Sequence, residues 1–177
     1  NAVGALLGNG WFKGPLAGWE KDARGKYGMR TSLLAEIRIV YRDGRRQTVA
    51  TDGTWKTSPG AILKSEIYDG EIYDAAKEQP GWDLPGFDDR GWTGAHPVTA
   101  DKRILTAQEN IPVKAQETIR PVSLFRTPKG ETVLDFGQNM VGWVRFRVSG
   151  PRGSRVLLHH AEILDKDGNL YTENLRS

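Results

Sequence analysis

The sequence contains no cysteine, no long apolar run and no histidine pattern typical of a metal site. Without cysteine there is no disulfide, and cysteine usage cannot indicate the redox compartment. No window approaches the roughly 20 apolar residues of a membrane helix, so no membrane partner is expected. His96, His159 and His160 fall outside the His-x-x-x-His spacing of zinc sites, and no serine lies in a nucleophile elbow. The residues therefore offer neither a zinc site nor a serine nucleophile.

Charge of one sign is not concentrated anywhere in the chain. The 25 basic and 22 acidic residues are interleaved and leave a net charge of +3. The densest basic group is Arg42 with Arg45-Arg46, which flanks a predicted turn. A solvated hairpin end explains it better than a nucleic-acid contact, so no nucleic-acid partner is expected.

Turn-forming residues and tryptophan are plentiful, and they predict an all-β chain of antiparallel β-sandwich, jelly-roll-like domains. The 177 residues include 21 glycines, 9 prolines and 6 tryptophans, which suits short strands with large aromatics between turns. Residues 31–41 alternate in polarity, and Asp43-Gly44 then predicts a hairpin with a return strand over residues 47–50. An apolar run over residues 1–7 predicts a buried strand.

The most regular stretch, residues 133–148, predicts a strand, a tight corner and a second strand. The corner is Gly137-Gln138-Asn139, whose two amides can bond nearby backbone. After it, apolar side chains at residues 144, 146 and 148 alternate with larger polar or aromatic ones, the period of a half-buried strand. Another strand is expected over residues 155–163, followed by a hairpin-type corner over residues 165–168.

We divide the chain into a partial sandwich over residues 1–100, a connection over residues 101–115 and a partial second sandwich over residues 116–177. The connection lies where the chain turns polar and loses any sustained period. The chain opens without a methionine inside a predicted strand and closes without a stop signal. We therefore expect a segment of a longer protein, whose targeting sequence would lie elsewhere.

A glycine-punctuated loop, Gly8-Asn9-Gly10-Trp11-Phe12-Lys13-Gly14, displays two aromatic side chains. In one interpretation it is a turn whose Trp11 folds over the sandwich edge, which fold-level frequencies favour. In the other, the Trp11 indole stacks on the apolar face of a sugar while Asn9 bonds its hydroxyl groups. The glycine spacing does not match phosphate-binding fingerprints.

Acidic residues gather around a predicted turn at Asp69-Gly70. The group consists of Glu66, Asp69, Glu71 and Asp74. It lacks the twelve-residue spacing of a calcium loop, and strand alternation would divide it between two faces. A solvated turn is a simpler interpretation than a calcium loop or a catalytic carboxylate pair.

A loop rich in proline and glycine over residues 79–92 carries three aromatic side chains. They are Trp82, Phe87 and Trp92. Compact loops of this kind pack their own side chains, so we expect a structural role at the end of a sandwich.

Five stretches, in order along nearly the whole chain, together resemble one family of enzymes. They are residues 6–14, residues 67–75, the loop from Gly81-Trp82 to Gly91-Trp92, residues 135–143 and residues 161–176. The combination resembles the amino-terminal part of bacterial α-L-rhamnosidases of glycoside hydrolase family 78. Any one stretch would be a weak signal, whereas five in order are specific.

The resemblance implies a large modular hydrolase. In that family, β-sandwich domains precede an (α/α)6 barrel whose acidic residues carry out inverting hydrolysis of terminal α-L-rhamnose residues. The resemblance places the barrel outside these residues, so it implies no catalytic residue here. It likens the first sandwich to a rhamnose-binding carbohydrate module and the second to a concanavalin-like domain. The compartment stays open, whether cytoplasmic, periplasmic or secreted.

Two functional hypotheses follow from the resemblance. In the preferred one, the segment supports the catalytic barrel of the same polypeptide, through an inter-domain contact at Gln138, Asn139 and Trp143. In the alternative, it is a carbohydrate-binding module for rhamnose-containing glycans or glycosides. The sugar-binding candidates are Asn9, Trp11, Asp69 and Glu71. Asn9-Gly10 offers one amide and no carboxylate, which argues against calcium, so neither a metal site nor another cofactor is expected.

Overall fold

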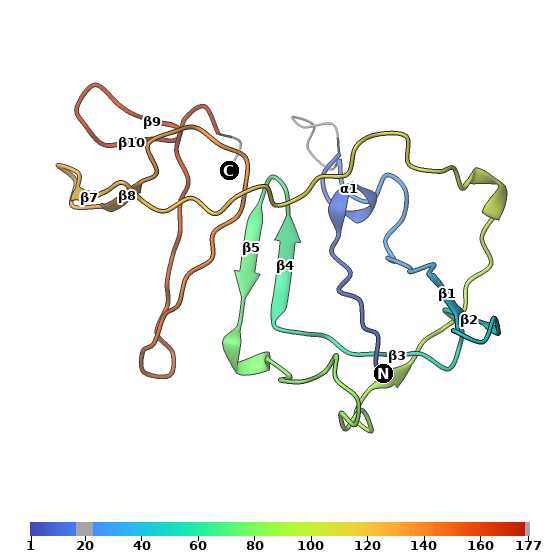
Figure 1. Cartoon of the computed structure of the whole chain (residues 1–177). Coiled ribbons are helices and arrows are strands. Elements are labelled where there is room, and N and C mark those ends of the chain that lie inside the picture. The colour runs from blue at the N-terminus through green and yellow to red at the C-terminus, as the bar shows by residue number, and fades with distance from the viewer. Residues whose placement is uncertain (17–22, 176–177) are drawn as a thin grey trace. The chain divides into compact units, whose positions relative to one another are not determined.

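The computed structural model describes residues 1–16 and 23–175, and the chain divides into two compact units. The first unit spans Asn1–Ile104 and the second begins at Leu105. Within the described ranges every sheet is a two-stranded antiparallel pair, and helices are few and short (Figure 1). The prediction of a strand-rich antiparallel chain is confirmed, whereas the packing of two sheets into a sandwich stays a prediction.

The first unit is built from three strand pairs, one turn of α-helix and two short 3-10 helices among its described residues. Its elements are α1 (Gly10–Lys13), β1 (Glu36–Val40), β2 (Arg46–Ala50), β3 (Lys56–Thr57), β4 (Ile62–Glu66), β5 (Gly70–Tyr73), η1 (Ala75–Lys77), β6 (Thr93–Gly94) and η2 (Lys102–Ile104). The pairs are β1 with β2, β4 with β5, and β3 with β6. Figure 1 shows β4 and β5 side by side and running in opposite directions.

The two hairpins of this unit form where the turn residues predict them. Between β1 and β2, the Tyr41 amide donates to the Arg45 carbonyl over 2.9 Å, and Gly44 has a φ of +83°. The Asp43 carboxylate accepts the Arg45 amide over 3.0 Å and closes the turn from within. Between β4 and β5, Gly70 has a φ of +72°. Glycine takes this left-handed conformation without a Cβ penalty, so both hairpins follow from local turn chemistry.

The second unit consists of two hairpins and a long segment between them. Its strands are β7 (Ser123–Arg126), β8 (Thr132–Asp135), β9 (Ile163–Leu164) and β10 (Leu170–Tyr171), paired as β7 with β8 and β9 with β10. The two hairpin turns meet at Asn169, whose side-chain oxygen accepts the Lys129 amide over 3.0 Å. Asn169 and Thr127 are the buried polar residues of the described chain. Burial of polar groups is tolerated here because each is hydrogen-bonded.

Three predicted strands are absent from the structure. Residues 1–7, 144–148 and 155–162 are extended but belong to no ladder within the described residues, and their side chains are mostly exposed. The alternating pattern decides which face a side chain takes, but a strand also needs a neighbouring backbone to pair with. No described segment of this chain supplies that neighbour.

The accessible surface shows how little of the chain is buried. It amounts to 16121 Å² for a mass of 19.7 kDa, whereas two separate compact domains of half that mass would together expose roughly 10,400 Å². Among the described Ala, Val, Ile, Leu, Met, Phe, Tyr and Trp residues, only Ala23 is buried. The apolar side chains that would form a core therefore lie on the surface. No described helix has the length and apolar character needed to cross a membrane.

Candidate functional site

The loop that displays Trp11 is fixed by a single helical turn. Its α1 closes with the Lys13 amide donating to the Asn9 carbonyl and the Gly14 amide to the Gly10 carbonyl, both over 3.1 Å. Asn9 precedes the helix but makes no side-chain cap to it, and its backbone is already helical, with a φ of −67° and a ψ of −38°. Gly10 has a φ of +49°, a conformation that suits glycine.

The side chain of Asn9 reaches the β4–β5 hairpin, far away in the sequence. Its Nδ2 donates to Glu66 Oε1 over 2.9 Å, and Arg24 Nη1 donates to both oxygens of the same carboxylate over 2.6 Å. Arg24 also pairs with Asp69, whose Oδ2 lies 3.6 Å from Lys64 Nζ. We call Asn9, Arg24, Lys64, Glu66 and Asp69 the Glu66 cluster. It fastens the α1 loop to the hairpin.

Backbone contacts place Arg24 beside α1. The Gly25 amide donates to the Lys13 carbonyl over 2.9 Å, and Pro15 forms an isolated antiparallel bridge with Arg24. Ala23, the neighbouring residue, is 2% exposed. The backbone of Arg24 is therefore packed against α1, and its guanidinium contacts the carboxylate of Glu66, whose side chain is only 4% exposed.

The charges of the Glu66 cluster compensate one another. A hydrogen bond with Glu66, together with the positive charges of Lys64 and Arg24, lowers the pKa of Asp69 below its ordinary value, against the opposite effect of burial. The hydrogen bond to Glu66 is also the main reason why the pKa of Arg24 is raised. The Asp69 carboxylate is thus stabilised as an anion by its neighbours in the cluster. Such an arrangement anchors the α1 loop to the hairpin.

Aromatic side chains lie on α1, the turn that the Glu66 cluster fastens. Trp11 is 53% exposed, and the ring of Phe12 stacks with that of Tyr27 at a centroid distance of 6.3 Å. Gly28 allows this packing, because a Cβ there would lie 3.0 Å from the Phe12 ring. The indole of Trp11 thus has accessible surface, as sugar stacking requires.

The structure brings together some of the predicted sugar-binding residues and not others. Asn9 and Asp69 are joined through Glu66 and Arg24. Glu71 lies opposite Ser65 on the hairpin, is exposed, and is not part of the cluster. The sequence did not single out Glu66 from its acidic neighbours, and it missed Arg24 and Lys64. Arg24 and Glu66 are 42 positions apart, and no local pattern relates a loop to a hairpin at that separation.

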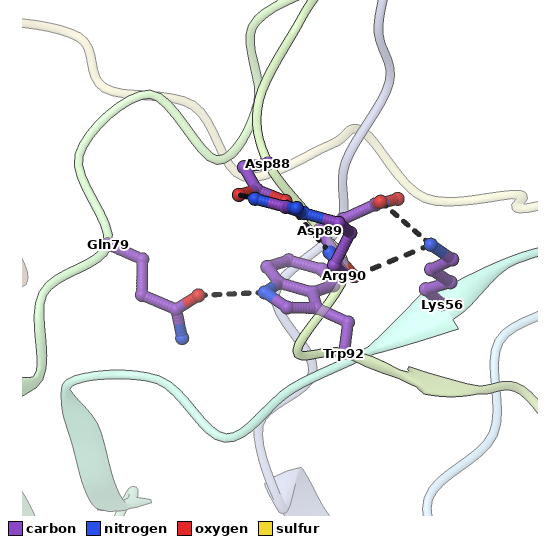
Figure 2. A network of polar contacts seen from close by, with 6 residues as sticks. All are labelled: Lys56, Gln79, Asp88, Asp89, Arg90 and Trp92. Carbon is purple, nitrogen blue, oxygen red and sulfur yellow. Dashed lines mark hydrogen bonds and ion pairs between the residues drawn. The ribbon is translucent and has the colours of Figure 1, made fainter.

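A second group of polar contacts ties the aromatic loop of residues 79–92 to its neighbours. Figure 2 shows the Trp92 indole N–H donating to Gln79 Oε1, over 2.8 Å, and Lys56 Nζ reaching the Asp89 carboxylate, over 2.7 Å. Trp92 also stacks with Trp82 at 6.4 Å and meets Phe87 edge-on at 5.7 Å. The loop packs its own aromatic side chains, as predicted, so its indoles serve the loop's structure.

The surface of the described residues includes two open hollows that are not lined by any residue of the Glu66 cluster. One, of about 430 Å³, lies between Trp82 and the extended residues 2–6. The other, of about 420 Å³, is lined by β9, β10 and their turn, including Asp165 and Lys166. In the part of the chain that the structure describes, no three His, Asp or Glu side chains gather in a way that could hold a metal ion.

The corner Gly137-Gln138-Asn139 of the second unit is exposed. Its hydrogen bond is made by the carboxylate of Asp135, which accepts the Gly137 backbone amide over 2.7 Å. Gln138 and Asn139 are exposed, and within the described residues no hydrogen bond involves their side chains. Trp143 is 75% exposed. The interpretation of the two amides as corner-bonding groups is therefore wrong, since Asp135 supplies that bond.

Comparison with protein families divides the chain into two matches. Residues 1–117 match the α-L-rhamnosidase N-terminal domain. Residues 125–177 match the bacterial α-L-rhamnosidase concanavalin-like domain. Together the two matches account for most of the chain.

Similar proteins are much longer than this chain. An α-L-rhamnosidase of Streptomyces avermitilis is 39% identical over 178 residues, which cover 100% of this chain and 17% of that protein. An α-L-rhamnosidase of an Alteromonas species is 35% identical, over 100% of this chain and 19% of its own length. The chain thus spans less than a fifth of the curated relatives named here.

Solved structures agree with these matches. The crystal structure of native α-L-rhamnosidase from Aspergillus terreus superposes with a TM-score of 0.82 at 36% identity, over 96% of this chain and 20% of that one. The Streptomyces avermitilis enzyme, solved in complex with L-rhamnose, also gives a TM-score of 0.82, at 37% identity over 95% of this chain and 16% of that one.

Proposed function

Because this chain belongs to the α-L-rhamnosidase family, we propose that it is a non-catalytic region that supports the catalytic domain of a glycoside hydrolase. The reaction of the whole enzyme would be hydrolysis of terminal non-reducing α-L-rhamnose residues. The catalytic (α/α)6 barrel of the same polypeptide would be its partner. In the whole enzyme the strand pairs described above would belong to antiparallel β-sandwiches.

The observation that carries this proposal is the large exposed apolar surface. A chain that leaves nearly all its apolar side chains accessible, at 16121 Å² of surface, is suited to being covered by other parts of a protein. Trp143, 75% exposed and a few residues after the exposed Gln138 and Asn139, is our candidate for the contact with the catalytic domain. An indole with neighbouring hydrogen-bonding groups is a common anchor at such contacts.

Two assays on the purified chain test the supporting function. We expect no hydrolysis of an aryl α-L-rhamnoside, and we expect self-association together with binding of a dye that reports exposed apolar surface. Hydrolysis of the rhamnoside would show that the chain holds catalytic residues after all. A monodisperse, cooperatively folded monomer would contradict a role that depends on being covered.

The alternative function is binding of rhamnose-containing glycans through the α1 loop. It is favoured by the accessible indole of Trp11, whereas the Nδ2 of Asn9 is already bonded to Glu66. Asp69 and Glu71 would lie on the same hairpin. Stacking of one indole on a sugar contributes on the order of 1 kcal/mol beyond area burial. Titration with millimolar L-rhamnose distinguishes the two functions. Heat release or a change of tryptophan fluorescence would favour sugar binding, and the absence of both signals would exclude it.

A further inference from the structure

Asn9 and Gly10, at the start of α1, form the one asparagine–glycine pair of the sequence. Asparagine is among the thermally labile residues, because its side-chain amide can react with the backbone nitrogen of the next residue. A glycine at that next position hinders the approach least, since it has no Cβ. The other asparagines precede alanine, isoleucine, methionine or leucine. The asparagine most open to this reaction is therefore the one that fastens the α1 loop.

The reaction is deamidation, and water is its only co-reactant. The Gly10 backbone nitrogen loses its proton and bonds to Cγ of Asn9, while the Cγ–Nδ2 bond breaks and ammonia leaves with the proton. A succinimide ring results. Water then adds to one of the two ring carbonyls and breaks its bond to the nitrogen. The product is aspartate or isoaspartate, depending on which bond breaks, and either one carries a carboxylate where Asn9 had an amide.

The backbone at this pair exposes the nucleophile but not the geometry that the reaction needs. Gly10 is exposed, and among the described residues its amide donates no hydrogen bond. Asn9 is half-buried and helical, with a ψ of −38°, and its carbonyl accepts the Lys13 amide over 3.1 Å. Closure of the ring draws Cγ onto the Gly10 nitrogen and requires Asn9 to leave this ψ. The first turn of α1 must therefore open before deamidation can occur.

The contact with Glu66 opposes that opening. Asn9 Nδ2 donates to Glu66 Oε1 over 2.9 Å, and the Glu66 side chain is only 4% exposed. Arg24 Nη1 holds both oxygens of the same carboxylate over 2.6 Å. Hydrogen bonds to charged groups are stronger than those between neutral groups, so the Asn9 amide leaves Glu66 only at a cost. The Glu66 cluster restrains the reaction as well as the loop.

Deamidation would upset the charge balance of the Glu66 cluster. The cluster now has two cations, Arg24 and Lys64, and two carboxylates, Glu66 and Asp69. A carboxylate in place of the Asn9 amide removes the donor to Glu66 and sets a like charge against it, in a place where Glu66 is nearly inaccessible to water. An isoaspartate also lengthens the backbone by one methylene group, which misaligns the Asn9 carbonyl with the Lys13 amide.

We propose that Asn9 is a site of spontaneous deamidation, that the Glu66 cluster keeps the reaction slow in the folded chain, and that the product releases the α1 loop from the β4–β5 hairpin. The inference goes beyond the supporting function and is independent of it. Hydrolysis of an aryl α-L-rhamnoside by this chain would end the supporting function and would leave the rate of deamidation unchanged.

Peptide mapping by mass spectrometry provides the first test. The chain is incubated at mildly alkaline pH, folded and unfolded in urea, and the amide-to-acid mass change is followed at Asn9 and at Asn139. We expect Asn9 to convert faster than Asn139 in urea, because a methionine follows Asn139. In the folded chain Asn9 should convert at least about 10-fold more slowly than in urea. Equal rates in either comparison would overturn the proposal.

Two substitutions test whether Glu66 provides the protection. Glu66→Ala should speed the conversion of Asn9 in the folded chain about 10-fold, because a hydrogen bond to a charged group is lost. Glu71→Ala, on the same hairpin but outside the cluster, should leave the rate unchanged. If Glu66→Ala does not fold, Glu66→Gln replaces it. Glu66→Gln keeps an acceptor oxygen without the charge and should speed the reaction by a smaller factor. A rate equal to that of Glu71→Ala would overturn the protective role.

The effect of the product is tested with Asn9→Asp, which places the new charge directly. Asn9→Ala is the matched control, because it removes the donor to Glu66 without adding a charge. Hydrogen exchange at the Gly14 and Gly25 amides, which close α1 and the neighbouring backbone, reports release of the loop. We expect exchange several-fold faster in Asn9→Asp than in Asn9→Ala. Exchange no faster than in the alanine variant would show that the product does not release the loop.

Discussion

The α1 loop and two extended segments between β8 and β9, residues 140–149 and 155–162, which we call the arms, are both irregular and accessible, yet they differ in what holds them. The α1 loop is held by side chains, since Asn9 and Arg24 converge on Glu66, 4% exposed. The arms have no such fastening and no strand ladder among the described residues. A loop can be fixed by one buried ionic contact, whereas an extended segment is fixed only when its whole edge is paired.

The largest expected effect comes from removing the centre of the Glu66 cluster. Glu66→Ala leaves the Asn9 and Arg24 donors without their acceptor, and hydrogen bonds to a charged group contribute about 2 kcal/mol. The amides of Gly14 and Gly25, which close α1 and its neighbouring backbone, should then exchange about 30-fold faster. Hydrogen exchange by NMR measures this directly.

Glu71→Ala is the matched control, because Glu71 is exposed on the same hairpin and lies outside the cluster. It should leave the exchange of Gly14 and Gly25 unchanged. Equal effects of the two substitutions would mean that the cluster does not fasten the loop, and the contrast with the arms would disappear.

The next effect concerns the joined turns of the second unit, which are held as the α1 loop is. Asn169 is 4% exposed, and its side-chain oxygen accepts the Lys129 amide over 3.0 Å. Asn169→Ala should destabilise this junction by about 1.5 kcal/mol, because the Lys129 amide loses the buried oxygen that accepts its hydrogen bond. The readout is faster exchange of the Lys129 and Asp165 amides.

Asn139→Ala, at the exposed corner between β8 and the first arm, is the comparison for Asn169→Ala. Its amide makes no hydrogen bond within the described residues, so the change in stability should stay within about 0.5 kcal/mol. A larger loss in the chain alone would show that the corner is fastened after all.

A smaller effect is expected in the aromatic loop. Trp92→Phe keeps a ring beside Trp82 and Phe87 but removes the N–H that donates to Gln79 over 2.8 Å. We expect a loss of about 1 kcal/mol, visible as faster exchange of the Ala95 amide, which bonds the Trp55 carbonyl. Trp143→Phe, at a side chain 75% exposed, should have almost no effect on the chain alone. Equal losses would mean that Trp143 is packed within this chain.

Sequence reasoning succeeded where the structure is set by neighbouring residues. Asp43-Gly44 correctly predicted the β1–β2 hairpin, and Asp69-Gly70 marked the turn between β4 and β5. In each turn the glycine takes a positive φ. These features depend on four or five adjacent residues, so the sequence contains all the information they need.

Sequence reasoning failed where distant parts must meet. Residues 144–148 have the period of a strand, but the period does not say which strand lies beside it, and within the described chain none does. Arg24 was missed because its partner Glu66 is 42 positions away. The five resembling stretches identified the family more reliably than any element identified the fold. A family resemblance uses the whole chain at once, whereas a strand prediction uses only a short window.

The smallest expected effect is that of pH on the Glu66 cluster. The pKa of Asp69 is lowered from its ordinary value of 3.8 by Glu66 and by the cations Lys64 and Arg24. A carboxyl group whose pKa is lower in the folded state stabilises that state when the pH is above its pKa in the unfolded chain. This stabilisation is lost as the pH falls through the pKa of the folded state.

The fastening of α1 should therefore be constant from pH 7 to about pH 5 and weaken only below about pH 4. Exchange at the Gly14 and Gly25 amides, corrected for the intrinsic pH dependence, measures it. Asp69→Asn should remove the part of the acid response that belongs to this carboxyl. Weakening that begins above pH 5 would mean that a group with a raised pKa controls the loop. The arms, which no titrating group of the described chain fastens, should show no such response, and an acid-dependent change confined to them would reverse the comparison.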